Sequence, residues 1–372
     1  MRNDRNKEMK NRTYFILPKY NRFCFKLYLC RMLKCTLNSD ELAKAKSIVD
    51  GAKKIVISTH ISPDGDAVGS SCAMAQMLVK LGKEVTIVLP DQAPSYLNWL
   101  AGNEYVVVCK EQVEETSKRI QEADAIFILD YNHLGRIGET VKKLLDAQIG
   151  VKPFILIDHH EQPATFPDVV YSDTSICSTC EMVFHFAGAM NWLELIDAPT
   201  AQAIYCGIMT DTMSFRFPSV SPETHEIAAW LMRKGLKPHV VHENVLDSQR
   251  VDRLRLMGYA LSECMTILPE YNAAFIAITK EKLDQFQPQS GDTEGLVNMA
   301  LSVEGTTIAA FFREDDDCVR ISFRSKGTRD VNQMARAHFN GGGHKNAAGA
   351  RLHESLEHTI AKFKELLQKG EI

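Results

Sequence analysis

The stretch KKIVISTHISPDGDAVGS, residues 53–70, decides the fold of this chain. It opens with the β-branched run Lys53–His60, which is typical of a buried parallel strand. A Pro-Asp-Gly-Asp turn then leads into a helical pattern over Ala67–Leu81, which Gly82 ends. Further strand-like runs alternate with helical segments, the strands at 84–90, 105–109, 125–130 and 153–158 and the helices at 111–122 and 137–147. This alternation predicts an α/β fold with a doubly wound, mostly parallel sheet.

The pattern changes in the second half of the chain. Helical segments come first, at 176–189, 199–210, 222–234 and 250–265. Strand-like runs at 271–279, 306–313 and 318–325 follow, together with helices at 330–339 and 354–369. We therefore expect the doubly wound domain to cover residues 32–235, a helical linker to cover 236–265, and a smaller α/β domain to cover 266–372.

Composition and charge exclude several classes of protein. The chain has 372 residues, of which 45% are hydrophobic and 24% charged, which is ordinary for globular domains. No uncharged apolar run approaches the roughly 18 residues of a membrane span. Residues 1–31 carry a net charge of +7 and the rest of the chain −11, which disfavours binding to long duplex DNA. Our hypothesis is that Met32 is the native start and that residues 1–31 are an upstream extension.

The ten cysteines show no framework spacing. The one C-x-x-C pattern, Cys177 to Cys180, lacks the second pair that a structural zinc site requires. We therefore expect free thiols and a reducing, cytoplasmic location.

Acidic residues and histidines gather in four motifs. One motif, His60-x-x-x-Asp64-x-Asp66, follows the first strand. The others are Asp130 and the triplet Asp158-His159-His160, which each end a predicted strand, and Asp211, which follows a helix. Open α/β sheets bind ligands at the carboxyl ends of their strands, so these side chains should converge on one cleft.

Such a cluster predicts a metal site. Four aspartates (64, 66, 130 and 211) with His60 and His159 cannot share a dry site without cations. Oxygen and imidazole donors favour Mn²⁺ or Mg²⁺, and Fe²⁺ or Co²⁺ also fit. Six ligands suit two ions about 4 Å apart that share one carboxylate, for which Asp130 is the candidate. Two ions of this kind activate water and clamp a phosphoryl group. Alone, Asp-Gly-Asp would be an ordinary turn and a single Asp after a strand would be a helix cap, whereas Asp-His-His is uncommon.

The C-terminal part offers candidate phosphate-binding groups. The run Gly341-Gly342-Gly343-His344 exposes backbone N–H groups to an anion. Arg324-Ser325-Lys326 ends a predicted strand shortly before it. Arg136 follows Asp130 closely and could either reach a phosphate or brace the loop. The alternative is a flexible turn with an exposed basic edge.

Taken together, the motifs resemble those of the DHH phosphoesterase superfamily. They are HISPDGDAVGS (60–70), LDYNHLGRIG (129–138), LIDHH (156–160), GIMTDT (207–212) and FRSKG…GGGHKNAAGA (323–350). The last block resembles the DHH-associated substrate-binding domain. The two-domain layout is similar to that of the oligoribonuclease (nano-RNase) and pAp-phosphatase branch, where pAp is 3′-phosphoadenosine 5′-phosphate.

This resemblance implies roles for individual residues. One ion would bind His60, Asp64 and Asp130, and the other would bind Asp66, Asp130, His159 and Asp211. His160 would contact the scissile phosphate, and Asp158 would orient its neighbours. Arg324, Gly342, Gly343 and His344 would hold the nucleotide. The implied cofactor is Mn²⁺, with Mg²⁺ or Co²⁺ as alternatives, and the implied substrates are short single-stranded RNA, dinucleotides and pAp.

Three other functions stay open at this point. The same metal site could hydrolyse inorganic pyrophosphate or polyphosphate, or the linear dinucleotides of cyclic-dinucleotide signalling. A non-catalytic nucleotide-binding regulator is the third alternative. The sequence leaves the oligomeric state undecided, with a homodimer compatible with it, and it indicates no membrane partner.

Overall fold

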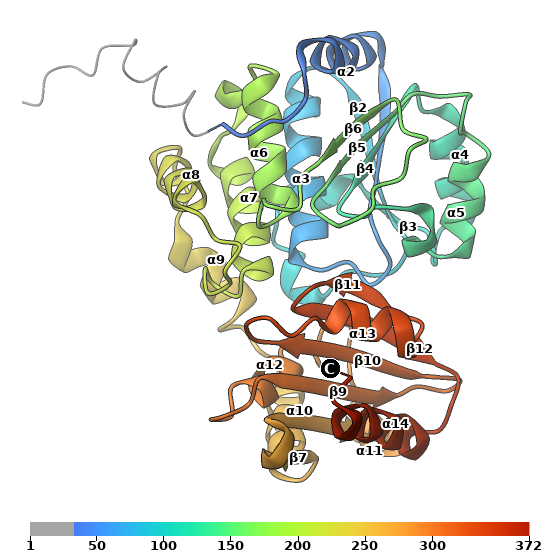
Figure 1. The fold of residues 1–372 in the computed structure, drawn as a ribbon. Coiled ribbons are helices and arrows are strands. Elements are labelled where there is room, and N and C mark those ends of the chain that lie inside the picture. Colours follow the sequence, from blue (N-terminus) through green and yellow to red (C-terminus); the bar gives the residue numbers. More distant parts are fainter. Residues whose placement is uncertain (1–32, 372) are drawn as a thin grey trace, which may run out of the picture. The chain divides into compact units, whose positions relative to one another are not determined.

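The computed structural model describes residues 33–371, so the hypothesis about residues 1–31 lies outside the described residues. Two six-stranded sheets organise this part of the chain (Figure 1). We call β1–β6 with their helices the parallel lobe, and β7–β12 with their helices the mixed lobe. The domain boundaries expected at residues 235 and 265 stay proposals.

The first sheet has the strand order β3-β2-β1-β4-β5-β6, and every neighbouring pair in it is parallel. Its strands are β1 (Lys54–Ser58), β2 (Glu84–Leu89), β3 (Val106–Val108), β4 (Ala125–Leu129), β5 (Phe154–Asp158) and β6 (Val169–Ser172). The apolar runs of β1, β4 and β5 occupy the centre of the sheet, where both faces are covered. The predicted α/β fold class is confirmed.

Helices cover both faces of the parallel sheet (Figure 1). On one side lie α4 (Val113–Glu122) and α5 (Glu139–Asp146), and on the other lie α3 (Gly65–Lys80), α6 (Thr179–Ala189) and α7 (Ala198–Asp211). Side chains alternate between the faces along each strand. Ile128 of β4 accordingly packs in the core beneath α4 and α5, whereas its neighbour Phe127 meets Phe186 of α6 at a ring distance of 6.4 Å. A further helix, α2 (Ser39–Gly51), precedes β1.

The second sheet has the order β11-β12-β10-β9-β8-β7, and only its β8–β9 pair is parallel. Its strands are β7 (Met265–Leu268), β8 (Ala273–Ile278), β9 (Ile308–Glu314), β10 (Val319–Ser325), β11 (Gly342–His344) and β12 (Ala347–Leu352). One face packs on α13 (Val331–His338) and α14 (Leu356–Lys369) through a cluster of five buried phenylalanines. The other face packs on α10 (Val251–Ser262) and α12 (Leu296–Leu301).

Two predicted elements are corrected by the structure. The helix expected over 250–265 ends at Ser262, and Met265 instead begins β7, which pairs with β8. The glycine run expected to form a loop contains β11, an edge strand that pairs with β12. Glycine disfavours strands intrinsically, and here the partner strand supplies the stability that the local sequence lacks.

Three helices follow α7 before the second sheet begins, namely α8 (Pro222–Arg233), α9 (Pro238–Val245) and α10. Leu256 and Ala260 of α10 are fully buried in the mixed lobe, so this helix forms part of the mixed lobe's core. Among the helices of residues 33–371, none has the length and apolar character that crossing a membrane requires.

Candidate metal centre

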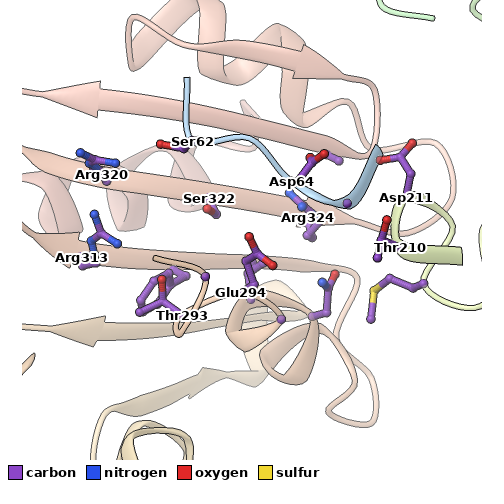
Figure 2. Close-up of a pocket in the computed structure, with 18 of the residues that line it drawn as sticks. Ser62, Asp64, Thr210, Asp211, Thr293, Glu294, Arg313, Arg320, Ser322 and Arg324 are labelled. Atoms are coloured by element: carbon purple, nitrogen blue, oxygen red, sulfur yellow. The ribbon is translucent and has the colours of Figure 1, made fainter. Parts of the chain in front are cut away.

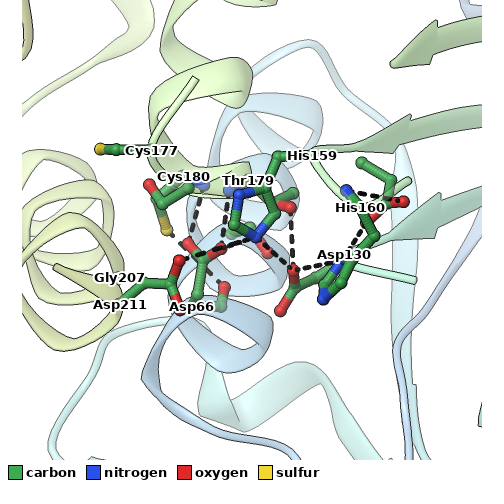
Figure 3. Close-up of polar contacts among 12 residues, drawn as sticks. Asp66, Asp130, His159, His160, Cys177, Thr179, Cys180, Gly207 and Asp211 are labelled. Atoms are coloured by element: carbon green, nitrogen blue, oxygen red, sulfur yellow. Dashed lines mark hydrogen bonds and ion pairs between the residues drawn. The ribbon is translucent and has the colours of Figure 1, made fainter. Parts of the chain in front are cut away.

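Three of the four predicted motifs leave the parallel sheet at the carboxyl ends of its central strands. His60 follows β1, Asp130 follows β4, and Asp158–His160 ends β5 and begins the next loop. Asp211 is the last residue of α7. Figure 3 shows that Asp66, Asp130, His159, His160 and Asp211 come together at this edge.

His60, Asp64 and Asp130 form the first cluster. His60 Nε2 lies 3.3 Å from Asp130 Oδ2 and 3.9 Å from Asp64 Oδ1. His60 Nδ1 lies 2.8 Å from the carbonyl oxygen of Ile61. A carbonyl oxygen only accepts hydrogen bonds, so Nδ1 carries a proton and Nε2 is the ring nitrogen that faces the carboxylates. Asp64 also caps α3, because its Oδ1 accepts from two backbone N–H groups of the first turn.

Asp66, His159 and Asp211 form the second cluster. His159 Nε2 lies 3.9 Å from Asp66 Oδ2 and 3.6 Å from Asp211 Oδ2. Its Nδ1 lies 3.3 Å from the carbonyl oxygen of Ile176, the same arrangement that orients His60. Both imidazoles therefore present Nε2 to carboxylates and fix Nδ1 on a backbone carbonyl, which is the usual environment of a metal-binding histidine.

Asp130 is a member of the first cluster and also faces His159 of the second. Its Oδ2 faces His60 at 3.3 Å, and its Oδ1 faces His159 at 3.7 Å. Thr179 Oγ1 donates a hydrogen bond of 2.9 Å to Oδ1. Asp130 also has a φ of +64°, a left-handed conformation that non-glycine residues adopt at a cost and that concentrates at functional sites. The backbone thus holds the one carboxylate that could serve two ions.

The electrostatics of the cluster favour a cation. Burial raises the pKa of Asp66 well above its ordinary value, and the charges of Asp130 and Asp211 raise it further. Burial, followed by the charges of Asp64 and Asp130, likewise raises the pKa of Asp211. Burial opposes the ionisation of Asp130 as well, but the contact with His60 prevails and lowers its pKa. A divalent cation would remove the repulsion among these carboxylates, and the oxygen and imidazole donors fit one.

The start of α6 supplies support that the sequence did not reveal. Asp66 Oδ2 accepts a 2.6 Å hydrogen bond from the backbone N–H of Thr179, and Oδ1 accepts one of 2.8 Å from Cys180. A helix N-terminus stabilises a carboxylate in this way. Gly207 of α7 packs against the same place, because a Cβ there would lie 2.2 Å from Cys180 Sγ and 2.6 Å from Asp66 Oδ1. The capping signal Ser178-x-x-Glu181 in the sequence is the one clue to this support.

His160 points along the same edge and is held by Asp158. Its Nδ1 lies 2.7 Å from Asp158 Oδ1, and its backbone N–H donates to Asp158 Oδ2 at 3.2 Å. Asp158 is fully buried, so its contact with the imidazole is shielded from solvent. His344 of the mixed lobe stacks on His160 at a ring distance of 4.5 Å and an angle of 25°. The structure therefore brings the predicted histidine of the glycine run to the DHH triplet.

A cavity of about 2320 Å³ opens beside the two clusters. Asp64, His159 and Asp211 line it from the parallel lobe, and Arg324 and His344 line it from the mixed lobe. Figure 2 shows Arg324 close to Asp64 and Asp211. The Nε of Arg324 is buried without a hydrogen-bond partner in residues 33–371, and Nη1 donates to the carbonyl oxygen of Phe323 at 3.0 Å.

The other predicted substrate residues take different positions. Ser325 also borders the cavity, but its hydroxyl donates to Arg329 O at 2.8 Å and accepts from Asn346 Nδ2 at 2.8 Å. Gly342 and Gly343 lie in β11, where the N–H of Gly343 donates to Asn332 Oδ1 at 2.9 Å. The charge of Arg136 contributes to lowering the pKa of His160, after the larger effects of burial and the opposing contact with Asp158.

Comparison with known proteins agrees with this geometry. Residues 54–208 match the family model "DHH family, N-terminal domain", and residues 272–369 match the model "DHHA1 domain". The bifunctional oligoribonuclease and PAP phosphatase NrnA of Bacillus subtilis is 27% identical over 335 residues, which cover 89% of this chain and 99% of that protein. The cyclic-di-AMP phosphodiesterase GdpP of the same species is 27% identical over 86% of this chain, but the match covers 49% of GdpP.

A solved structure resembles the whole described fold. The crystal structure of an exopolyphosphatase-related protein from Bacteroides fragilis superposes with a TM-score of 0.84 at 36% sequence identity. The alignment covers 91% of this chain and 98% of that one. With both family models matched in order and a relative of this similarity over its full length, the chain belongs to the DHH family and carries a DHHA1 domain.

Proposed function

We propose that this protein is a metal-dependent phosphoesterase that hydrolyses short oligoribonucleotides to mononucleotides and removes the 3′-phosphate of pAp. The observation that carries the proposal is the placement of Asp130, which presents one oxygen to each of two ligand clusters. Support for the substrates comes from NrnA, which matches this chain over almost its whole length.

In this proposal the ligands divide as the two clusters do. His60 and Asp64 would hold one divalent cation, Asp66, His159 and Asp211 would hold the other, and Asp130 would join both. When bound, such a pair supplies Lewis-acid activation of water and neutralises charge on the phosphoryl oxygens. Mn²⁺ is the cation we propose first, with Mg²⁺ and Co²⁺ as alternatives, because the donors are carboxylate and imidazole.

The remaining residues would bind and orient the substrate. His160, held by Asp158, faces the edge where the scissile phosphate would lie. Arg324, which lines the cavity, would bind a phosphate oxygen through its guanidinium. His344 would contact the nucleotide from the mixed lobe, so that both lobes close on one short substrate. The cavity exceeds the roughly 300–1,000 Å³ of common small-molecule sites, which leaves room for more than one nucleotide.

Two relatives favour specific alternatives. GdpP is named as a cyclic-di-AMP phosphodiesterase, and the Bacteroides protein is named as related to exopolyphosphatases. A substrate panel separates them: pApA, pAp, linear and cyclic di-AMP, pyrophosphate and polyphosphate, each with Mn²⁺ and with Mg²⁺. We expect the highest kcat/KM for pApA and pAp. Higher kcat/KM for polyphosphate, or nucleotide binding without any hydrolysis, would contradict the proposal.

A further inference from the structure

One loop of the mixed lobe places a carboxylate in the cavity, outside the metal clusters. Glu294 lies just before α12, and its Oε2 accepts a hydrogen bond from the hydroxyl of Tyr96 in the parallel lobe. The loop packs tightly at this point, because a Cβ on Gly291 would lie 3.0 Å from Pro94 Cβ and 3.1 Å from Tyr96 Cε1. Gly291 also has a φ of +88°, so both space and backbone conformation favour glycine there.

Two arginines of the α10 region hold this loop from its other side. Arg253 donates from Nη2 to the carbonyl oxygen of Glu294 at 3.2 Å and from Nε to that of Asp292 at 3.3 Å. Arg250 Nη1 donates to Asp292 Oδ2 at 2.8 Å. The backbone of Glu294 is therefore fixed, and its side chain is directed into the cavity.

Glu294 faces the place where a substrate would lie next to Arg324. Figure 2 shows its carboxylate near Ser322 and Arg324, and Asp64 also lines the cavity. Glu294 is an exposed residue that lines the cavity.

Arg324 and Glu294 have opposite preferences for the ligand groups that they bind. The guanidinium of Arg324 binds a phosphate oxygen. A carboxylate at the adjacent position repels a second phosphate and, when ionised, can only accept hydrogen bonds. The complementary ligand group is a hydroxyl or an amino group, which a nucleoside carries and an inorganic polyphosphate lacks.

We propose that Glu294 accepts a hydrogen bond from the nucleoside part of the substrate, either a ribose hydroxyl or a base amino group, and that it selects nucleotides against polyphosphate chains. Carboxylates bind ribose hydroxyls in the same way in dinucleotide-binding folds. This inference rests on the proposed function, because it assumes that the cavity takes nucleotides.

A purely structural role for Glu294 makes a different prediction. In that case the bond with Tyr96 only holds the lobes together, and its loss would weaken every ligand of the cavity equally. The carboxylate has a second oxygen for which the described residues show no hydrogen bond, and our proposal assigns that oxygen to the ligand. Tyr96→Phe is the matched control, because it removes the bond between the lobes and keeps the carboxylate.

The experiment is calorimetric titration of AMP, dAMP, UMP and pyrophosphate into the full chain with Mn²⁺ present. We expect Glu294→Ala to weaken AMP binding about 10- to 100-fold, the range for a hydrogen bond to a charged group. Pyrophosphate binding should stay within twofold or become tighter. Glu294→Gln, which keeps an acceptor oxygen, should recover part of the AMP affinity, and Tyr96→Phe should keep the wild-type ratio of AMP to pyrophosphate affinity.

The additional ligands identify which donor Glu294 contacts. If the ribose 2′-hydroxyl is bound, dAMP binds the wild type as weakly as AMP binds Glu294→Ala, and if the adenine amino group is bound, UMP does so. If Glu294→Ala lost affinity equally for AMP and pyrophosphate, or lost affinity for neither, the inference would be overturned. Because these titrations measure binding, they remain informative even if pApA and pAp are not hydrolysed, a result that would contradict the proposed function by itself.

Discussion

Gly207→Ala tests the packing that supports the metal centre. The new methyl group would lie 2.2 Å from Cys180 Sγ, 2.6 Å from Asp66 Oδ1 and 2.8 Å from Cys180 Cβ. Both neighbours are buried, and Asp66 is tied to the start of α6 by two backbone hydrogen bonds. Relief of the clash must therefore move either the carboxylate or the two helices that meet there.

The magnitude follows from two opposing contributions. Inserting a methyl group into a packed core costs about 1–3 kcal/mol, and three contacts below 3 Å place this site at the upper end. Exchanging glycine for alanine within a helix stabilises the helix by about 1 kcal/mol. We expect a net loss of about 2 kcal/mol in the free energy of unfolding, and weaker Mn²⁺ binding because Asp66 is displaced.

The assay is urea unfolding in the presence of EDTA, followed by calorimetric titration of Mn²⁺ into the folded variant. Gly258→Ala is the matched control, because Gly258 lies in α10 and a Cβ there has no atom within 4 Å. The free energy of unfolding of Gly258→Ala should rise by up to about 1 kcal/mol, and this variant should bind Mn²⁺ as the wild type does. If Gly207→Ala were as stable as Gly258→Ala and bound Mn²⁺ equally well, the reasoning about this contact would be refuted.

Three further outcomes are expected. Asp130→Ala should lower kcat for pApA more than about 100-fold even with excess Mn²⁺. Asp124→Ala, at the opposite end of β4, is the control and should keep most of the turnover. Similar activity of the two variants would contradict the shared-ligand role of Asp130. His344→Ala should raise KM for pApA about ten-fold with little change in kcat, because the proposed contact between His344 and the nucleotide is lost. An unchanged KM would argue against that contact. Free Mn²⁺ at 100 times its Kd should raise the free energy of unfolding by about 2.7 kcal/mol for each ion bound, measured by thermal unfolding. EDTA should reverse the gain, and absence of a shift would contradict specific binding.

Much of the fold and of the candidate centre could be predicted because the signals are local. The β-branched run at 54–58 forms a buried strand, and acidic residues that directly follow such strands must lie at one edge of a parallel sheet. That rule alone brings His60, Asp130 and His159 together.

The parts that could not be predicted depend on tertiary contacts. The N–H groups of Thr179 and Cys180 that hold Asp66 are backbone donors, which exist at every position and leave no mark in the sequence. The left-handed conformation of Asp130 is likewise imposed by its surroundings. Tyr96 and Glu294 are 198 positions apart and meet only because the lobes pack together, so no spacing could reveal the pair.

The central claim is that two divalent cations share Asp130, and anomalous scattering from crystals grown with Mn²⁺ tests it most directly. We expect two manganese peaks, one ligated by His60, Asp64 and Asp130 and the other by Asp66, Asp130, His159 and Asp211. Crystals with no manganese at this edge of the sheet, or with a single ion that Asp130 does not touch, would contradict it.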